Sequence, residues 1–220
     1  MSINLREPDF RAAVFDLDGT LFDSMMIWNR IDEIFLARRG INEVPEDYLL
    51  AIAHLGAIET ANYTIKRFGL TDTPEQMIQE WSEQALDFYR NEVTLKKGAL
   101  GYLTKLRNAG IHLAVATASS EDLYLPAIKR CGLDGFFEAY ANVGECERKK
   151  GFPDVYLLAC QRMNADPADA VVFEDIYVAI KGAKSGGFRT AGVYDETSAR
   201  DTELIKAEAD EFIFSFEELL

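Results

Sequence analysis

The chain has 220 residues, 48% of them hydrophobic, and a formal net charge of −14 at pH 7; this length suffices for one domain and a smaller one. The acidic balance argues against a nucleic-acid-binding surface, which depends on clustered Lys and Arg side chains. The three cysteines show no C-x-x-C spacing, as is typical of reduced thiols. Residues 1–10 lack the apolar core of a signal peptide, and no apolar run is long enough to span a bilayer. We therefore expect a cytoplasmic protein with no membrane partner.

The first predicted strand covers residues 12–15, a continuous apolar run followed by Asp16-Leu17-Asp18-Gly19. Such a run is typical of a strand buried on both faces of a parallel sheet. Asp16 then lies at the carboxyl end of the strand, where open α/β sheets bind their ligands. This position suits a nucleophile or a metal ligand at Asp16 and a proton carrier at Asp18. The alternative is that Asp18-Gly19 only forms a turn.

Residues 24–91 contain no convincing strand and form an all-helical insertion after the first strand. Four helical patterns follow one another, at residues 24–39, 46–53, 57–68 and 74–91. Ser24 is a candidate N-cap for the first of them. We predict that the insertion is a lid over the ligand edge of the sheet. The predicted division is an α/β core domain of residues 1–22 and 93–220 and a helical cap domain of residues 23–92, with hinges at the two junctions.

Beyond residue 97, strands alternate with helices, which is typical of a doubly wound sheet. Apolar runs predict strands at residues 113–116, 137–142, 170–173, 188–194 and 211–214. Helical spacing predicts helices at residues 98–108, 122–131, 153–163 and 178–185. We therefore predict an α/β fold, a doubly wound, Rossmann-like parallel sheet with a small all-α cap domain inserted after the first strand.

Two of the later strands also end in polar residues, Thr117-Ala118-Ser119 after one and Glu174-Asp175 after the other. Because the carboxyl ends of parallel strands lie on one edge of the sheet, we expect Asp16, Thr117 and Asp175 to converge.

Four segments, in this order, resemble the signatures of the haloacid dehalogenase superfamily, in the branch that contains β-phosphoglucomutases and phosphatases with a helical cap. They are Asp16-Leu17-Asp18-Gly19-Thr20-Leu21-Phe22-Asp23-Ser24, Val115-Ala116-Thr117-Ala118-Ser119, Lys150-Gly151-Phe152-Pro153-Asp154 and Val172-Phe173-Glu174-Asp175. Together they extend over nearly the whole chain. The resemblance implies a Mg²⁺-dependent phosphatase of a small phosphorylated metabolite, such as a sugar phosphate, acting through an aspartyl-phosphate intermediate.

The resemblance also implies roles for the acids. Asp16 resembles the nucleophile that takes the phosphoryl group, and Asp18 the general acid that later activates water as a base. Asp16, the backbone carbonyl of Asp18 and Asp175 are the implied Mg²⁺ ligands, with Glu174 as a ligand either directly or through water. The hard cation would offset repulsion between carboxylates and phosphate. The structural alternative for Glu174-Asp175 is an acidic pair at a helix N-terminus.

The remaining signatures imply a cradle for the phosphoryl group. Thr117, through its hydroxyl, and Ala118 and Ser119, through their backbone N–H groups, suit phosphate oxygens. Lys150, rather than the lysine before it, matches the position of the family's cationic residue. The alternatives are a helix cap for Thr117 and a solvated charge run for Lys150. Gly151 stands where the family usually has proline, and its freedom is expected to loosen the Lys150 loop.

The cap residues are expected to select the substrate. In the β-phosphoglucomutase branch a histidine generally stands ten residues after the second aspartate, where this chain has Trp28, which favours hydrolysis over mutase activity. Met25, Met26 and Trp28 are predicted to lie in the cap core, with a pocket lining as the alternative. His54 is a candidate substrate-binding residue, although a lone histidine more often has a local structural role.

Two other functions stay open. A phosphosugar mutase would use the same core and yield a positional isomer instead of inorganic phosphate. An inactive binding or regulatory module would normally have lost one of the four charged positions, and all four are present. Nothing in the sequence demands an assembly, so we expect a monomer.

Overall fold

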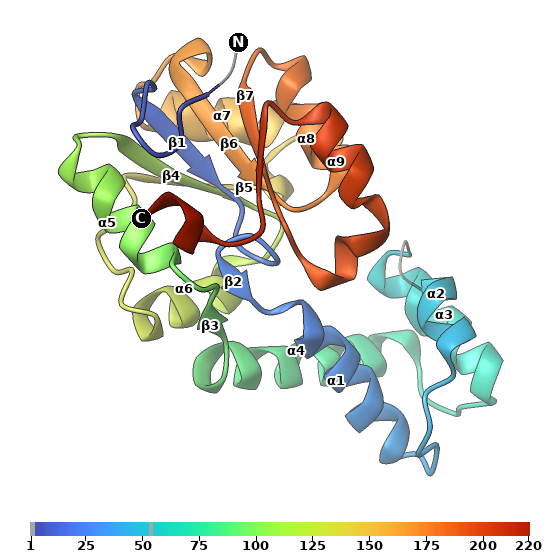
Figure 1. The fold of residues 1–220 in the computed structure, drawn as a ribbon. Helices are drawn as coiled ribbons and strands as arrows, with labels where there is room; N and C mark the ends of the chain where they lie inside the picture. Colours follow the sequence, from blue (N-terminus) through green and yellow to red (C-terminus); the bar gives the residue numbers. More distant parts are fainter. Residues whose placement is uncertain (1–2, 53–54) are drawn as a thin grey trace. The chain divides into compact units, whose positions relative to one another are not determined.

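The computed structural model, which describes residues 3–52 and 55–220, divides into two compact units (Figure 1). The first comprises Met1–Ser24 and Val93–Leu220, and the second comprises Met25–Glu92. In the described part of the chain, no helix is both long and apolar enough to cross a membrane. The three cysteines, Cys131, Cys146 and Cys160, are free thiols.

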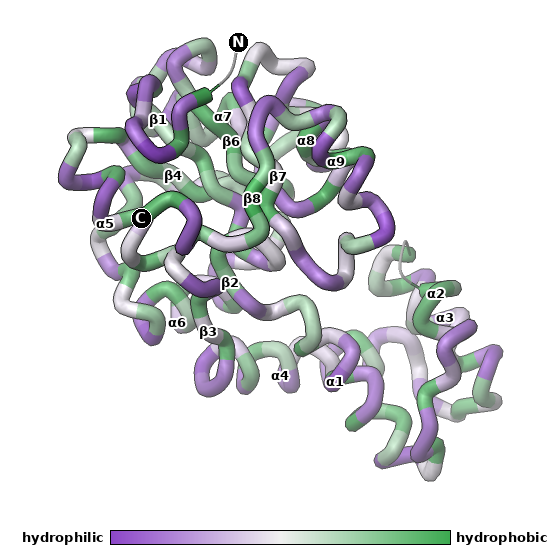
Figure 2. The backbone as a smooth tube through the Cα atoms, in the orientation of Figure 1, coloured by the Kyte–Doolittle hydropathy of each residue, from purple (hydrophilic) through white to green (hydrophobic). Residues whose placement is uncertain are grey.

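A parallel six-stranded sheet in the order β5-β4-β1-β6-β7-β8 forms the centre of the first unit. Its strands are β1 Ala12–Phe15, β4 His112–Thr117, β5 Ala139–Asn142, β6 Ala170–Glu174, β7 Arg189–Val193 and β8 Glu211–Ile213. β1 lies between β4 and β6, with Ala12 level with His112 on one side and Ala170 on the other. The sheet strands are mostly hydrophobic (Figure 2), as expected for strands buried on both faces.

The helices of the first unit are α5 Ala99–Asn108, α6 Glu121–Arg130, α7 Asp154–Arg162, α8 Tyr177–Ser185 and α9 Thr202–Glu208. Short 3₁₀ helices are η1 Val143–Glu145, η2 Pro167–Asp169, η3 Glu196–Asp201 and η4 Phe216–Leu219. On one face of the sheet, Val14 of β1 belongs to a core cluster with Tyr156 of α7. On the other face, Phe15 stacks on Phe173 at 4.4 Å between ring centroids, and Tyr102 of α5 meets Phe173 edge to face.

The regular elements in the described part of the second unit are all helices: α1 Met25–Ala37, α2 Glu46–Ile52, α3 Ala57–Phe68 and α4 Pro74–Asn91. Helix α4 begins with a capping box, in which Thr73 accepts from the backbone N–H of Gln76. The ring of Phe35 in α1 packs 5.4 Å from that of Trp81 in α4.

The predicted fold class is confirmed, and every strand and helix predicted from the sequence is present. Besides the short 3₁₀ helices, three described elements were not predicted: β2 Phe22–Asp23 and β3 Thr94–Leu95, which pair antiparallel, and α9. Strands of two residues are too short to show alternation, and α9 buries only Ile205, so it has no apolar stripe.

The prediction that Met26 and Trp28 lie in the core of the helical unit is wrong. Their exposed fractions are 53% and 38%. Helix α1 buries Ile27, Ile31 and Phe35 instead. This spacing of four residues defines the apolar face of the helix and turns the neighbouring side chains away from it.

Candidate active site

The carboxyl edge of the sheet gathers the predicted acids. Asp16 directly follows β1, Thr117 ends β4, and Glu174 ends β6 just before Asp175. β1 pairs with both β4 and β6, and the backbone N–H of Asp16 donates to the carbonyl of Phe173 at 3.1 Å. The side chains after these strands therefore share one edge of the sheet.

Lys150 joins two of these acids. Its Nζ contacts Asp16 Oδ1 and lies 2.6 Å from Glu174 Oε1. The side chain is buried, whereas that of Lys149 is exposed. The structure thus brings Lys150, the residue predicted from the signature, to the acids.

Asp16, Glu174 and Asp175 form a buried carboxylate cluster in which one oxygen from each residue lies within 4.8 Å of the other two. Glu174 Oε2 is buried and has no hydrogen-bond partner among the residues that the structure describes. Converging carboxylates with a free buried oxygen match the ligands that Mg²⁺ prefers, so these residues fit a hard divalent cation.

The three carboxyl groups of this cluster outnumber the single ammonium group of Lys150 that contacts two of them. Burial, and then the charge of Glu174, raise the pKa of Asp16 well above its usual range despite the nearby ammonium of Lys150. The same two causes raise the pKa of Asp175 to about 7. Burial alone would lower the pKa of Lys150, but Asp16 and Glu174 together raise it, so Lys150 stays charged. A bound cation would reverse the shifts of the carboxyl groups.

Asp18 lies beside the carboxylate cluster, at a turn. Gly19 has a φ of 82°, a conformation that glycine adopts without strain, and the chain reverses there. Both carboxylate oxygens of Asp18 accept from hydroxyl groups, Oδ1 from Ser24 at 2.6 Å and Oδ2 from Ser119. The hydrogen bond from Ser119 therefore links Asp18 to the segment that follows β4.

The end of β4 carries the predicted phosphate cradle. Thr117 is buried, and its Oγ1 accepts from the backbone N–H of Ser119 at 3.0 Å. Ala118 is exposed. The carbonyl of Ser119 accepts from Asn142 Nδ2 at 2.6 Å, which fixes this segment against the end of β5.

The sequence reasoning missed several partners of the acids. The hydroxyl of Tyr156, on α7, donates to Glu174 Oε1 at 2.8 Å. Asp175 accepts from Thr20 at 3.2 Å and lies 3.5 Å from the hydroxyl of Ser198. Thr20 belongs to the first signature, but nothing local marks Tyr156, which resembles an ordinary core aromatic residue.

An ion pair between Lys96 and Asp195 was also missed. Lys96 Nζ lies 2.8 Å from Asp195 Oδ2 and donates to the carbonyl of Tyr194 at 2.6 Å. Burial would raise the pKa of Asp195, but hydrogen bonds from Lys96 and Thr197 hold it below its usual range. Asp195 follows β7, so the rule that identified Asp16 and Glu174 could have identified it as well.

Two predictions concern histidines. His54 lies outside the described residues, so its role in substrate binding stays a prediction. His112 begins β4, at the end of the strand opposite the acids, and its Nδ1 lies 2.9 Å from the carboxylate of Glu138.

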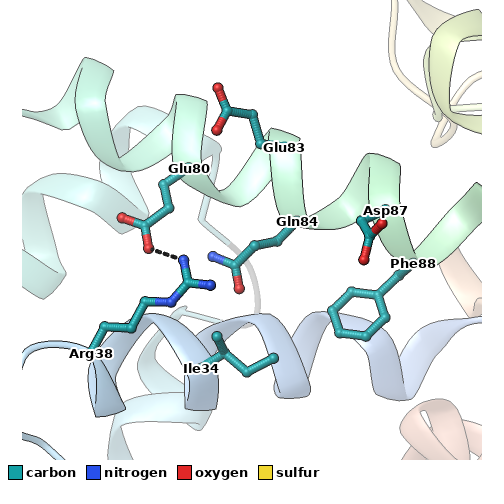
Figure 3. Close-up of a pocket in the computed structure, with 7 residues that line it drawn as sticks. All are labelled: Ile34, Arg38, Glu80, Glu83, Gln84, Asp87 and Phe88. Atoms are coloured by element: carbon teal, nitrogen blue, oxygen red, sulfur yellow. Dashed lines mark hydrogen bonds and ion pairs between the residues drawn. The ribbon is translucent and has the colours of Figure 1, made fainter.

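A separate groove of about 300 Å³ lies between α1 and α4 of the helical unit (Figure 3). The described residues that line the groove are Ile34, Arg38, Glu80, Glu83, Gln84, Asp87 and Phe88. None of them belongs to the predicted site.

Comparison with known proteins identifies the family. Residues 13–193 match the model of the family described as haloacid dehalogenase-like hydrolase. The chain is 25% identical over 194 residues to pyrophosphatase PpaX of Bacillus pumilus, covering 86% of this chain and 85% of the relative. It is 28% identical over 205 residues to validoxylamine A 7'-phosphate phosphatase of Streptomyces hygroscopicus, covering 91% and 92%. The crystal structure of CbbY from Rhodobacter sphaeroides in complex with phosphate is similar, with a TM-score of 0.77, 26% identity and 96% of each chain covered.

The family model covers most of the chain and all four signature segments, and the relatives are similar over most of their length. This chain therefore belongs to the haloacid dehalogenase-like hydrolase family.

Proposed function

We propose that the protein is a Mg²⁺-dependent phosphatase that hydrolyses a small phosphorylated metabolite, such as a sugar phosphate, through an aspartyl-phosphate intermediate. The observation that carries the proposal is the contact of Lys150 with both Asp16 and Glu174, beside Asp175, at the carboxyl edge of the sheet. The names of the two relatives, pyrophosphatase PpaX and validoxylamine A 7'-phosphate phosphatase, support this substrate class.

The reaction would have two steps. A carboxylate oxygen of Asp16 attacks phosphorus, the bond between phosphorus and the substrate oxygen breaks, and that oxygen takes a proton from Asp18. Water then attacks the phosphorus of the aspartyl phosphate and gives its proton to the Asp18 carboxylate. Inorganic phosphate leaves, and both aspartates return to their starting states.

Asp16, Glu174 and Asp175, with the backbone carbonyl of Asp18, would hold Mg²⁺. When bound, the cation supplies positive charge that offsets repulsion between the carboxylates and the phosphoryl group.

Lys150 would stabilise charge on the phosphoryl group, because its ammonium is buried beside Asp16 and Glu174, which raise its pKa. Thr117 and the N–H groups of Ala118 and Ser119 would bind phosphate oxygens. Because the N–H of Ser119 donates to Thr117 Oγ1 here, it would change partner when phosphate binds.

The helical unit would act as a cap that selects the substrate and excludes water on closure. Its hinges would be the two segments where the chain passes from one unit to the other, next to the paired strands β2 and β3. In this proposal residues 23–92 form the cap and residues 1–22 and 93–220 the catalytic core. A cytoplasmic location and a monomeric state stay predictions.

A panel of metabolite phosphates tests the function. We expect Mg²⁺-dependent release of inorganic phosphate from at least one sugar or polyol phosphate, and no release by Asp16→Asn. A positional isomer as the product, with no phosphate released, would indicate a mutase instead. Folded protein that binds a panel member without turning it over would indicate a binding or regulatory module.

A further inference from the structure

Glu174 receives two hydrogen-bond donors on the same oxygen. Lys150 Nζ lies 2.6 Å from Oε1, and the hydroxyl of Tyr156 donates to that atom at 2.8 Å. Both donors come from the third signature segment and the first turn of the helix after it. A carboxylate oxygen offers two lone pairs, so Oε1 has no acceptor capacity left.

The other oxygen of Glu174 is in the opposite situation. Oε2 is buried and has no hydrogen-bond partner among the residues that the structure describes. An unpaired buried carboxylate oxygen is costly, because it has lost its water and gained nothing in return. Such an atom indicates a ligand position, and Asp16 and Asp175 lie beside it.

Tyr156 is held rigidly where it makes this contact. Its side chain is fully buried in the core cluster between α7 and the sheet, and its ring meets Phe188 edge to face at 6.1 Å. Lys150 also contacts Asp16, so its position depends on two acids. The hydroxyl of Tyr156 is therefore the donor to Oε1 that comes from a fixed position in the core, beside that from Lys150.

We propose that Tyr156 is a positioning residue of the metal site: by occupying Oε1, it fixes Glu174 with Oε2 turned to the cation as a direct, monodentate ligand. The inference rests on the proposed function, because it assumes that the carboxylate cluster binds Mg²⁺. Hydrogen-bond partners of metal ligands orient those ligands, and their loss typically weakens metal binding about 10- to 100-fold.

Tyr156→Phe tests the inference, since it removes the hydroxyl and keeps the ring. Tyr102→Phe is the matched control: Tyr102 is also fully buried, and its hydroxyl donates to the carbonyl of Leu5 at 3.0 Å, not to an acid. Titration calorimetry with Mg²⁺ measures affinity in each full-length protein, and thermal unfolding measures stability. The Mg²⁺ concentration that gives half-maximal phosphate release is an independent readout.

We expect Tyr156→Phe to bind Mg²⁺ about 10- to 100-fold more weakly than wild type and Tyr102→Phe to bind it normally. Turnover of Tyr156→Phe should recover largely at high Mg²⁺. Wild-type Mg²⁺ affinity in Tyr156→Phe, with only a lower unfolding temperature, would show a merely structural tyrosine and overturn the inference alone. Failure of the wild-type protein to bind Mg²⁺ would overturn the metal site of the proposed function as well.

Glu174→Gln gives a second test that does not depend on the folding of Tyr156→Phe. Its amide oxygen can still accept from Lys150 and Tyr156, which leaves an NH₂ group at the position of Oε2. We expect loss of Mg²⁺ binding in the calorimeter. Unchanged binding would overturn direct ligation by Glu174.

Discussion

A Cβ atom on Gly182 would lie 2.2 Å from the carbonyl oxygen of Lys150, so α8 and the Lys150 loop are in direct backbone contact. The backbone of the two following loop residues would lie 2.8 and 2.9 Å from the same Cβ. Only glycine permits this approach. The position of Lys150 between Asp16 and Glu174 therefore depends on a residue 32 positions later in the chain.

Gly182→Ala should destabilise the protein and displace Lys150. Alanine has the higher helix propensity, by about 1 kcal/mol, but the clash is with backbone, and overpacking typically costs about 1–3 kcal/mol. We expect a lower unfolding temperature and a reduced kcat. Gly151→Ala is the control, because its Cβ would meet only Val178 Cγ1 at 3.8 Å, an ordinary contact. If both variants behave like wild type, the close approach does not hold the loop.

Lys150→Met should lower kcat by about 10²- to 10³-fold, the typical effect of removing one group that stabilises charge in the transition state. Lys149→Met should leave kcat within about two-fold, because its side chain is exposed. Steady-state kinetics of both variants on the same substrate make the comparison. Equal losses would mean that the two lysines share the role.

Asp18→Asn should lower kcat by about 10²- to 10⁴-fold, because an amide transfers no proton to the leaving oxygen and takes none from water. Asp23→Asn serves as the control, since Asp23 is exposed in β2 within the same signature. A substrate with a leaving group that needs no proton should recover part of the first step. If Asp18→Asn turns over normally on all substrates, Asp18 is not the proton carrier.

Asp32→Asn should stabilise the protein more at pH 8 than at pH 5. Burial raises the pKa of Asp32 in α1 to about 7, although a hydrogen bond from Tyr48 opposes the shift. The raised value means that the neutral carboxyl favours folding. This stability is fully present below the unfolded-state pKa and is lost as the pH rises through about 7.

Relative to acid pH, the free energy of unfolding that is lost at pH 8 is at most roughly 4 kcal/mol, and partial exposure of Asp32 reduces this value. Thermal unfolding of wild type and Asp32→Asn at both pH values measures the effect. Glu33→Gln, an exposed neighbour, should show no comparable difference. A stabilisation of Asp32→Asn that is equal at pH 5 and pH 8 would exclude titration of Asp32 as its cause.

Local patterns in the sequence predict much of the core and of the candidate site. The run at residues 12–15 is apolar throughout because β1 is buried on both faces, and this places Asp16 at a strand end. Glu174 follows from the same reasoning at β6. The helices of the second unit were predicted because their apolar spacing and end signals are local. The prediction that Met26 and Trp28 lie in the core was wrong because residue type alone does not define which face of α1 is buried.

Other features of the site depend on contacts between distant segments. The charge run before residue 151 contains two adjacent lysines, and only packing against the strand ends buries Lys150 and leaves Lys149 in solvent. The backbone approach at Gly182 and the hydroxyl of Tyr156 on Glu174 have no local signal, because each joins residues from different elements. By itself the sequence determined the fold class, the family and the acids at the strand ends, since periodicity and signature segments are properties of neighbouring residues. Tertiary structure alone decided that Tyr156 reaches Glu174 and which oxygen of Glu174 has no partner among the described residues, because both depend on burial and on hydrogen bonds across the fold.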